Sequence, residues 1–264
     1  MANKKKKKVV KRKKRVILLN IIYILAFLLC IYFATTIVLN KVNERRDAAR
    51  AREISDLYKE LYNDFYSNKT SLVQELRNVY LNNDIVGIIE IPDLDISTPI
   101  VQTDNNTFYL NHLIDRRKAR YGSLFVDYRA DINFSPLVVI YGHNDVEQDT
   151  REELPLRKLN RLLNESVFNR SENIRIITEN KTLNFKILAL KLSSRETIYP
   201  NSVFFSAADF NNYLSILLED SLYKKNINVN RGSQILVLQT CITDTNDDID
   251  KFLLLIAKRV DNYE

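Results

Sequence analysis

A run of 25 residues without a charged side chain, from Val16 to Asn40, constrains the fold of this chain more than any other feature. Ile, Leu, Val, Phe and Tyr dominate it. At about 1.5 Å per helical residue, the run can cross a hydrocarbon core of roughly 30 Å with some tilt. A cleaved signal peptide has a shorter apolar region, of roughly 7–15 residues, and a small-residue cleavage site, which is not evident here. The sequence therefore predicts one transmembrane helix over residues 16–40.

Charge is distributed unevenly around this run. The 264 residues carry a formal net charge of +6, but residues 1–15 alone contain ten Lys or Arg and no acid. The remaining chain holds 29 basic and 33 acidic residues. A basic tail can bind nucleic acid, but this one leads directly into the apolar run, and the positive-inside rule places it in the cytoplasm. We therefore predict a cytoplasmic tail over residues 1–15, no nucleic-acid partner, and an extracellular position from Lys41 onward.

Residues 41–83 are predicted to be helical and to join the span to the main domain. After a charged stretch, apolar residues recur at helical spacing in two sets, separated by a polar break at Ser67–Thr70. This pattern predicts two helices or one kinked helix. These helices could be a spacer or a partner-binding surface. The spacing favours the other alternative, in which their apolar face packs on the main domain. The two sets are Ile54, Leu57, Tyr58, Leu61, Tyr62 and Phe65, and Leu72, Val73, Leu76, Val79 and Tyr80.

From Ile85 the apolar pattern changes to short β-type runs, broken by Pro and Asp. About eight strands with few helices predict a mainly β fold over residues 84–264, a closed β-barrel with helical insertions rather than a parallel α/β sheet. One insertion follows Pro155, and the other follows a capping box formed by Ser206 and Asp209. The predicted strands are Ile85–Pro92, Ile96–Val101, Ser123–Asp127, Leu137–Tyr141, Ile174–Thr178, Leu183–Leu192, Ile235–Gln239 and Phe252–Ala257.

The two cysteines of the chain cannot pair within one molecule. Cys30 lies in the predicted span, whereas Cys241 ends the apolar run Gln234–Cys241 in the exported part. An unpaired cysteine outside the cytoplasm is either a reactive thiol or a small buried hydrophobe. A thiol at a strand end can be aimed rigidly while staying open to a cleft, so Cys241 is the candidate nucleophile.

Only two histidines are available to activate this thiol. His143 follows the strand Leu137–Ile140, and we expect Gly142 to let the backbone turn sharply so that the imidazole stands at a strand end. An imidazole beside a thiol favours the thiolate and transfers a proton during acyl transfer, without a metal or other cofactor. His112 is the competing candidate and ranks lower. For either histidine, the alternative is a structural hydrogen-bonding role.

Metal chemistry is poorly supported by the sequence. Two histidines and one accessible cysteine without close spacing do not make a zinc site. The acidic loop after Cys241 lacks the central Gly and terminal Glu of a calcium loop, so we expect it to be solvated. Its carboxylates would disfavour the thiolate, which makes a positive partner for Cys241 more necessary. The acidic residues are Asp244, Asp247, Asp248 and Asp250.

The cysteine and the histidine stand in sequence blocks that follow one another along residues 84–260. Leu238-Gln-Thr-Cys241 and Tyr141-Gly-His-Asn144 carry the two side chains, and a helical insertion at Ser206–Leu222 precedes the cysteine strand. The other blocks are Val86–Pro92, Thr98–Gln102, Tyr109–His112 and Gly122–Tyr128. Together they resemble the class B branch of the sortases, membrane-anchored cysteine transpeptidases of Gram-positive bacteria.

The resemblance implies an eight-stranded barrel and a defined reaction. The Cys241 thiolate would attack the Thr carbonyl of a short sorting motif near the C-terminus of an exported protein, and His143 would protonate the leaving amine. A primary amine from a cell-wall precursor or a pilin-like subunit would then resolve the thioester. Thr240 and Asn144, next to the pair, would bind substrate. The protein would act as a single-pass enzyme of the cell membrane.

The sequence departs from the family pattern at a third position. The family uses an arginine on the strand after the cysteine loop to hold the substrate or its oxyanion. Asp250, Lys251 and Phe252 stand there instead, so Lys251 is predicted to supply the charge without the planar fork of donors. Arg259 is an alternative if the alignment shifts by several residues. Gln239 stands where class B members often carry a small residue.

Two other functions fit the same residues. A cysteine peptidase shares the acyl-enzyme step but lets water resolve it. A non-catalytic surface-binding module, in which Cys241 is structural, would account for the missing arginine.

Overall fold

The computed structural model describes residues 2–65, 69–144, 155–194, 206–230, 232–243 and 250–260. The chain divides into two compact units, residues 1–50 and residues 51–264. Residues 2–50 of the first unit are α-helical and belong to α1 (Ala2–Asp64). From Ile17 onward α1 is long and apolar enough to cross a membrane, and the side chains of its most apolar window are not buried. By length and composition it is a candidate membrane span.

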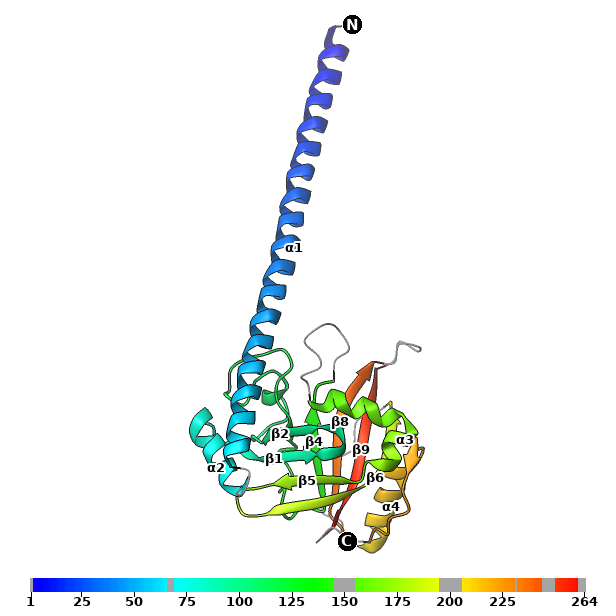
Figure 1. Ribbon diagram of the computed structural model, residues 1–264. Coiled ribbons are helices and arrows are strands. Elements are labelled where there is room, and N and C mark those ends of the chain that lie inside the picture. The colour runs from blue at the N-terminus through cyan, green and yellow to red at the C-terminus, as the bar shows by residue number, and fades with distance from the viewer. Residues whose placement is uncertain are drawn as a thin grey trace. The chain divides into compact units, whose positions relative to one another are not determined.

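The second unit is built around a closed β-barrel (Figure 1). Eight strands pair in the order β5-β1-β2-β3-β4-β8-β9-β6, and β6 pairs with β5 to close the ring, which confirms the predicted eight-stranded fold. A further short strand, β7, pairs with β6. The strands are β1 (Ile85–Ile91), β2 (Ile96–Val101), β3 (Phe125–Val126), β4 (Leu137–Gly142), β5 (Asn173–Ile177), β6 (Thr182–Ser193), β7 (Tyr223–Lys224), β8 (Ile235–Thr243) and β9 (Asp250–Val260).

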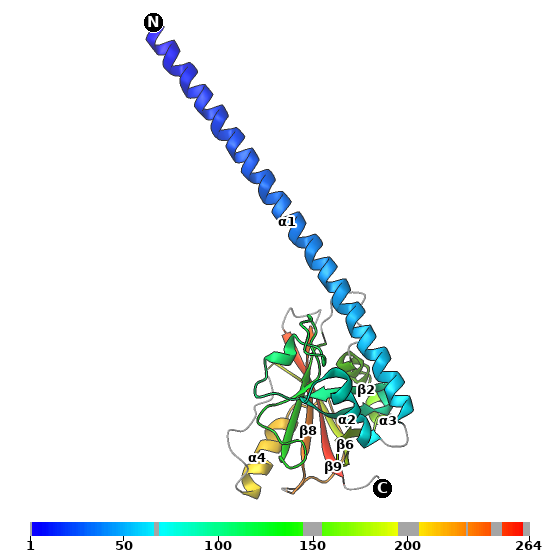
Figure 2. The ribbon, with the colours of Figure 1, turned by 90° about the vertical axis from the view of Figure 1, so that its left-hand side faces the viewer.

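Strands β4, β8 and β9 are buried on both faces, which explains their continuous apolar sequences. Alternate residues such as Leu236 and Leu238 point into the barrel, where they pack with Val138 and Ile140. The residues between them form a second cluster with Phe210 and Leu217 of α4 (Ala207–Leu218). This helix begins at the predicted capping box, in which the Ser206 and Asp209 side chains bond each other's backbone N–H groups. In Figure 2, α4 lies on the opposite side of the barrel from α2.

The insertion after Pro155 is a 3₁₀-helix, η4 (Pro155–Leu163), followed by a short α-helix, α3 (Glu165–Arg170). Leu156, Leu159 and Leu162 are fully buried in the main core. A 3₁₀-helix has three residues per turn, so this spacing aligns all three leucines on one face. Two shorter 3₁₀ turns, η1 (Pro92–Leu94) and η2 (Phe108–Leu110), connect the first strands.

The helical segments before the barrel pack against it, as their apolar spacing predicted. Tyr58 of α1 and Leu72, Val73 and Leu76 of α2 (Lys69–Tyr80) are buried in a cluster with residues of β1, β2, β3 and β5. A charged contact adds to this packing, because Glu90 of β1 is buried and accepts a hydrogen bond from Lys69 at 2.9 Å. Residues 51–65 and 69–80 are therefore part of the globular unit.

Candidate active site

The strand register brings the predicted site residues to one end of the barrel. Strands β4 and β8 run parallel, and Gly142 lies opposite Thr240. His143 and Cys241 each follow directly, so their backbones lie at the same level of neighbouring strands, which are about 4.8 Å apart in a sheet. On the other side, β9 runs antiparallel to β8 and places Lys251 opposite Ile242. The side chains of Cys241 and Lys251 and the acidic loop 244–248 lie outside what the structure describes.

His143 is held by the loop that carries η2. Its Nε2 lies 2.8 Å from the carbonyl oxygen of Leu110, and the ring is half-buried. The backbone of Leu110 can approach because Gly122, at φ 55°, faces it, and a Cβ there would lie 2.7 Å from the Leu110 carbonyl oxygen. If Nε2 is protonated and donates a hydrogen bond to the Leu110 carbonyl, the other ring nitrogen, Nδ1, is available to exchange a proton with the thiol.

Gly142 is needed for packing rather than for a turn. It is the last residue of β4, and it is not among the described glycines with positive φ. A Cβ at this position would lie 2.1 Å from Leu124 Cδ2 and 2.8 Å from Leu156 Cδ1. The leucine side chains of the main core thus occupy the space beside the residue that precedes His143, and the expected sharp turn is not its role.

Asn144 is 1% exposed and forms a side-chain pair with η4. Its Nδ2 donates to Asn160 Oδ1 at 2.7 Å, and Asn160 Nδ2 donates back to Asn144 Oδ1 at 3.3 Å. These two bonds fix the chain immediately after His143.

Thr240 is 2% exposed, and its hydroxyl has no hydrogen-bond partner among the described residues. A buried hydroxyl without a partner costs about 1–3 kcal/mol. An unpartnered polar group next to a candidate nucleophile is therefore a feature that the fold alone does not require.

The competing residues have structural roles elsewhere. His112 stacks on Phe108 with ring centroids 4.0 Å apart, and its Nδ1 lies 2.7 Å from the Phe108 carbonyl oxygen. Arg259 bonds the carbonyl of Asn133 and the side chain of Gln234, both at 3.2 Å. Gln234 precedes β8, and at about 3.3 Å per residue Arg259 is roughly 20 Å from the Cys241 end of the strand. The alternative assignment of the arginine role to Arg259 is wrong.

A buried carboxylate ties the strands behind the site together. Asp127 accepts bonds from Arg129, from Asn106 Nδ2 and from Tyr141 OH, the last two at 2.9 Å. Tyr141 lies two residues before His143. Burial acts to raise the pKa of the Asp127 carboxyl, but the hydrogen bonds from Arg129, Asn106 and Tyr141 outweigh it and hold the pKa below its usual value.

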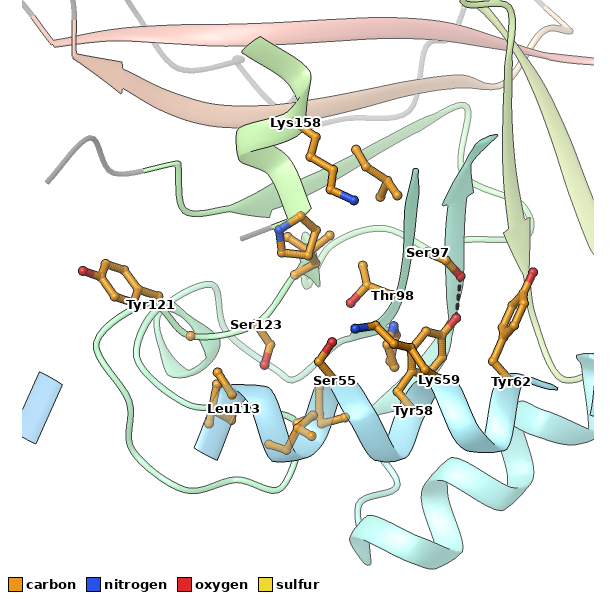
Figure 3. A pocket seen from close by; sticks show the side chains of 18 of the residues that line it. Ser55, Tyr58, Lys59, Tyr62, Ser97, Thr98, Leu113, Tyr121, Ser123 and Lys158 are labelled. Carbon is orange, nitrogen blue, oxygen red and sulfur yellow. Dashed lines mark hydrogen bonds between the residues drawn. The ribbon is translucent and has the colours of Figure 1, made fainter. Parts of the chain in front are cut away.

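His143 is one of the residues that line a cavity of about 490 Å³. Figure 3 shows this cavity with the side chains around it. Its walls come from the last turns of α1, the start of β2, the loop 113–124 and the start of η4. Sequence reasoning missed this cavity and the lysines in it, Lys59 and Lys158, because they are far apart in the chain. It also missed Leu110 and Asn160, which act through backbone and amide contacts that leave no sequence signal.

The chain is similar to known proteins over most of its length, although no protein-family model matches it. It is 30% identical over 188 residues to sortase B of Listeria monocytogenes, covering 70% of this chain and 74% of the relative. The X-ray structure of Clostridium perfringens sortase B superposes with a TM-score of 0.60 at 28% identity, over 71% of this chain and 99% of the other. A structure of sortase B complexed with triglycine gives a TM-score of 0.68 at 21% identity, covering 82% and 98%.

The closed eight-stranded barrel and the similarity to these relatives together show that the protein is a cysteine transpeptidase. Within that class, the chain belongs to the sortase B family. The resemblance seen in the sequence blocks is thereby confirmed, and the alternative of a non-catalytic surface-binding module is set aside.

Proposed function

We propose that this sortase cleaves a sorting motif near the C-terminus of exported proteins and transfers the acyl part to a primary amine through a thioester on Cys241. One observation supports these residue roles above all. The parallel register of β4 and β8 puts the residues after Gly142 and Thr240, His143 and Cys241, at the same end of neighbouring strands.

In the first half of the reaction, the Cys241 thiolate attacks the Thr carbonyl carbon of the motif. The C–S bond forms, the peptide C–N bond breaks, and His143 gives its proton to the leaving amine. The hydrogen bond between His143 and the Leu110 carbonyl supports this role, because it orients the ring by one nitrogen and leaves the other available.

Lys251 is assigned the place of the family arginine. Its backbone on β9 lies opposite Ile242, the residue after Cys241, so Lys251 is at the same end of the barrel as the thiol. An ammonium stabilises an oxyanion but lacks the bidentate geometry of a guanidinium. We assign Thr240 and Asn144 to the support of the substrate site, because both are buried, Thr240 directly before Cys241 and Asn144 holding the chain after His143.

The acceptor is a primary amine, supplied by a cell-wall precursor or by a pilin-like subunit. The related sortase B in complex with triglycine supports an acceptor with a free amino end, since that peptide carries one. Residues 1–15 form the cytoplasmic tail, residues 16–40 span the membrane and residues 41–83 connect to the catalytic domain, residues 84–264. The apolar helix and the charge asymmetry around it support this topology.

Product analysis tests the proposal. The enzyme is incubated with a library of short Thr-containing peptides and an excess of triglycine, and products are identified by mass spectrometry. We expect one peptide to be cleaved after Thr and joined to triglycine, and Lys251→Ala to slow this reaction about 100–1,000-fold while Lys251→Arg retains it. Cleavage with water as the only acceptor would instead indicate a cysteine peptidase.

A further inference from the structure

The cavity beside His143 extends well beyond what proton transfer requires. One wall is formed by residues of α1 between Ala51 and Asn63, and the opposite wall includes Pro155 and Lys158 of η4. Hydroxyl groups of Ser97 and other residues line it along with apolar side chains. A site of this size can hold a short peptide, and His143 stands at its edge.

Two lysines reach into the cavity from opposite walls, Lys59 from α1 and Lys158 from η4 (Figure 3). The ammonium of Lys158 donates to the carbonyl oxygen of Asp95, which fixes its position. Burial lowers the pKa of Lys158 and outweighs the Asp95 carboxylate, which raises it, while the positive charges of Arg161 and Lys59 lower it by smaller amounts. The two lysines therefore sense each other's charge across the cavity.

The carboxylates near these two lysines, Asp56 and Asp95, are mostly exposed to water. Lys59 pairs with Asp56 of the same helix at 3.6 Å, but both side chains are mostly exposed, and such pairs contribute little in water. The Asp95 carboxylate lies 3.7 Å from Arg161, which competes for it. An anionic group bound between Lys59 and Lys158 would relieve the repulsion.

We propose that this cavity is the acceptor subsite and that it takes a short peptide carrying both a free amino group and a carboxylate. The carboxylate lies between Lys59 and Lys158, and the amine lies at His143. The inference rests on the proposed function and adds the chemical class of the acceptor. The positive surroundings also favour the neutral, nucleophilic form of the bound amine over the ammonium.

In the transfer step, the bound amine resolves the thioester on Cys241. The amine nitrogen attacks the thioester carbonyl carbon, the C–N bond forms and the C–S bond breaks. The sulfur leaves as the Cys241 thiolate, and the proton lost by the amine passes to His143, which became neutral when it protonated the first leaving group. Thiolate and imidazolium are thus regenerated.

Triglycine and triglycinamide separate the effect of the carboxylate from that of the amine, because both peptides carry a free amino end and only the first has an anion. In the intact enzyme, acyl-enzyme formation, hydrolysis and ligation are measured with each acceptor. We expect a KM for triglycine about fivefold lower than for triglycinamide, the size expected for one partly solvated ion pair. The rate of acyl-enzyme formation does not depend on the acceptor.

Variants assign this preference to the cavity. The double variant Lys59→Gln/Lys158→Gln is expected to bring the two KM values within about twofold of each other. Lys158→Arg, which keeps the charge, retains the preference. Lys224→Gln is the matched control, because Lys224 is exposed on β7 and does not line the cavity.

Binding to the Cys241→Ala variant gives a readout that does not need catalysis. Triglycine titrated into this variant and observed by NMR is expected to bind more tightly than triglycinamide, and the added lysine substitutions are expected to remove the difference. Equal binding of both peptides, or a preference that survives the double substitution, overturns the subsite. Absence of any acyl-enzyme with intact triglycine binding overturns the proposed function but not the subsite.

Discussion

At the scale of single residues, the position of His143 depends on groups that are not themselves reactive. The Leu110 carbonyl holds one ring nitrogen, Asn160 fixes the chain after the ring, and the space beside Gly142 fixes the chain before it. Each of these contacts acts on the direction of the imidazole. Small changes here should therefore affect activity more than stability.

Gly142→Ala tests this directly. The new Cβ would lie 2.1 Å from Leu124 and 2.8 Å from Leu156, so the end of β4 must shift. Overpacking of this kind costs about 1–3 kcal/mol, and displacing a catalytic group by about 1 Å can cost about 10²-fold in rate. We expect the melting temperature to fall by a few degrees and the rate of acylation to fall about 100-fold. Unchanged acylation in the folded variant would contradict the role assigned to this packing.

Asp127 gives a prediction on pH. Its folded-state pKa lies below the value of about 3.9 for an unfolded carboxyl, so its contribution to stability is complete above that value. The contribution is lost as the pH falls through the folded-state pKa. Asp127→Asn should lower the free energy of unfolding at pH 7 by about 2–3 kcal/mol, since Arg129 loses the Asp127 carboxylate. Denaturant unfolding should also show less acid sensitivity in the variant than in the unsubstituted protein; equal acid sensitivity would contradict the assignment.

Sequence reasoning works at this scale only where a residue type is rare. Only one cysteine lies outside the predicted membrane span, and the chain has two histidines, so few Cys–His pairs had to be considered. The register places one of these pairs, Cys241 and His143, at the ends of neighbouring strands. Lys158 could not be selected in the same way, because it is one of 39 basic residues and its significance comes from Lys59 across the cavity.

At the scale of elements, the helices before the barrel are part of its core. Glu90 of β1 is buried and bonds Tyr62 of α1 at 2.5 Å and Lys69 of α2 at 2.9 Å, and Arg175 of β5 lies 2.9 Å from its other oxygen. Removing the helices would leave this carboxylate with one cation and would expose the apolar faces of β1 and β2. A buried charge that loses a partner is costly.

Truncation separates a packed element from a spacer. A protein that begins at Ala51 should unfold cooperatively, whereas one that begins at Ile85 should lack a cooperative transition and bind a hydrophobic dye. Leu76→Ala, which only opens a cavity at the same contact, should cost about 2–5 kcal/mol and keep cooperativity. Equal melting temperatures for the two truncated proteins would show that the helices are only a spacer.

The pattern of apolar residues predicted most elements because their burial is regular. The prediction for β2, Ile96–Val101, matches the observed bounds, and the runs of β4, β8 and β9 are apolar since both faces are covered. β7 was missed because it is two residues long and Lys224 is exposed. The leucines after Pro155 indicated a helix, but their spacing of three fits the 3₁₀ form, which tertiary burial stabilises.

At the scale of the whole molecule, the chain joins an apolar N-terminal helix to a barrel enzyme. Residues 16–40 carry no charge and residues 1–15 carry ten positive charges. If this topology is correct, the full-length protein expressed in Gram-positive cells sediments with membranes, and protease added outside protoplasts digests the barrel. Deleting residues 1–40 should release a soluble protein with unchanged acylation. A barrel protected from external protease in intact protoplasts would contradict the orientation.

The central claim is that Cys241 forms the thioester and that His143 supports it. Peptide mapping by mass spectrometry after reaction with the preferred sorting peptide tests this most directly. We expect an acyl adduct on the fragment that contains Cys241, no adduct in Cys241→Ala and only a trace in His143→Ala. An undiminished adduct in Cys241→Ala, or on a fragment without Cys241, would contradict it.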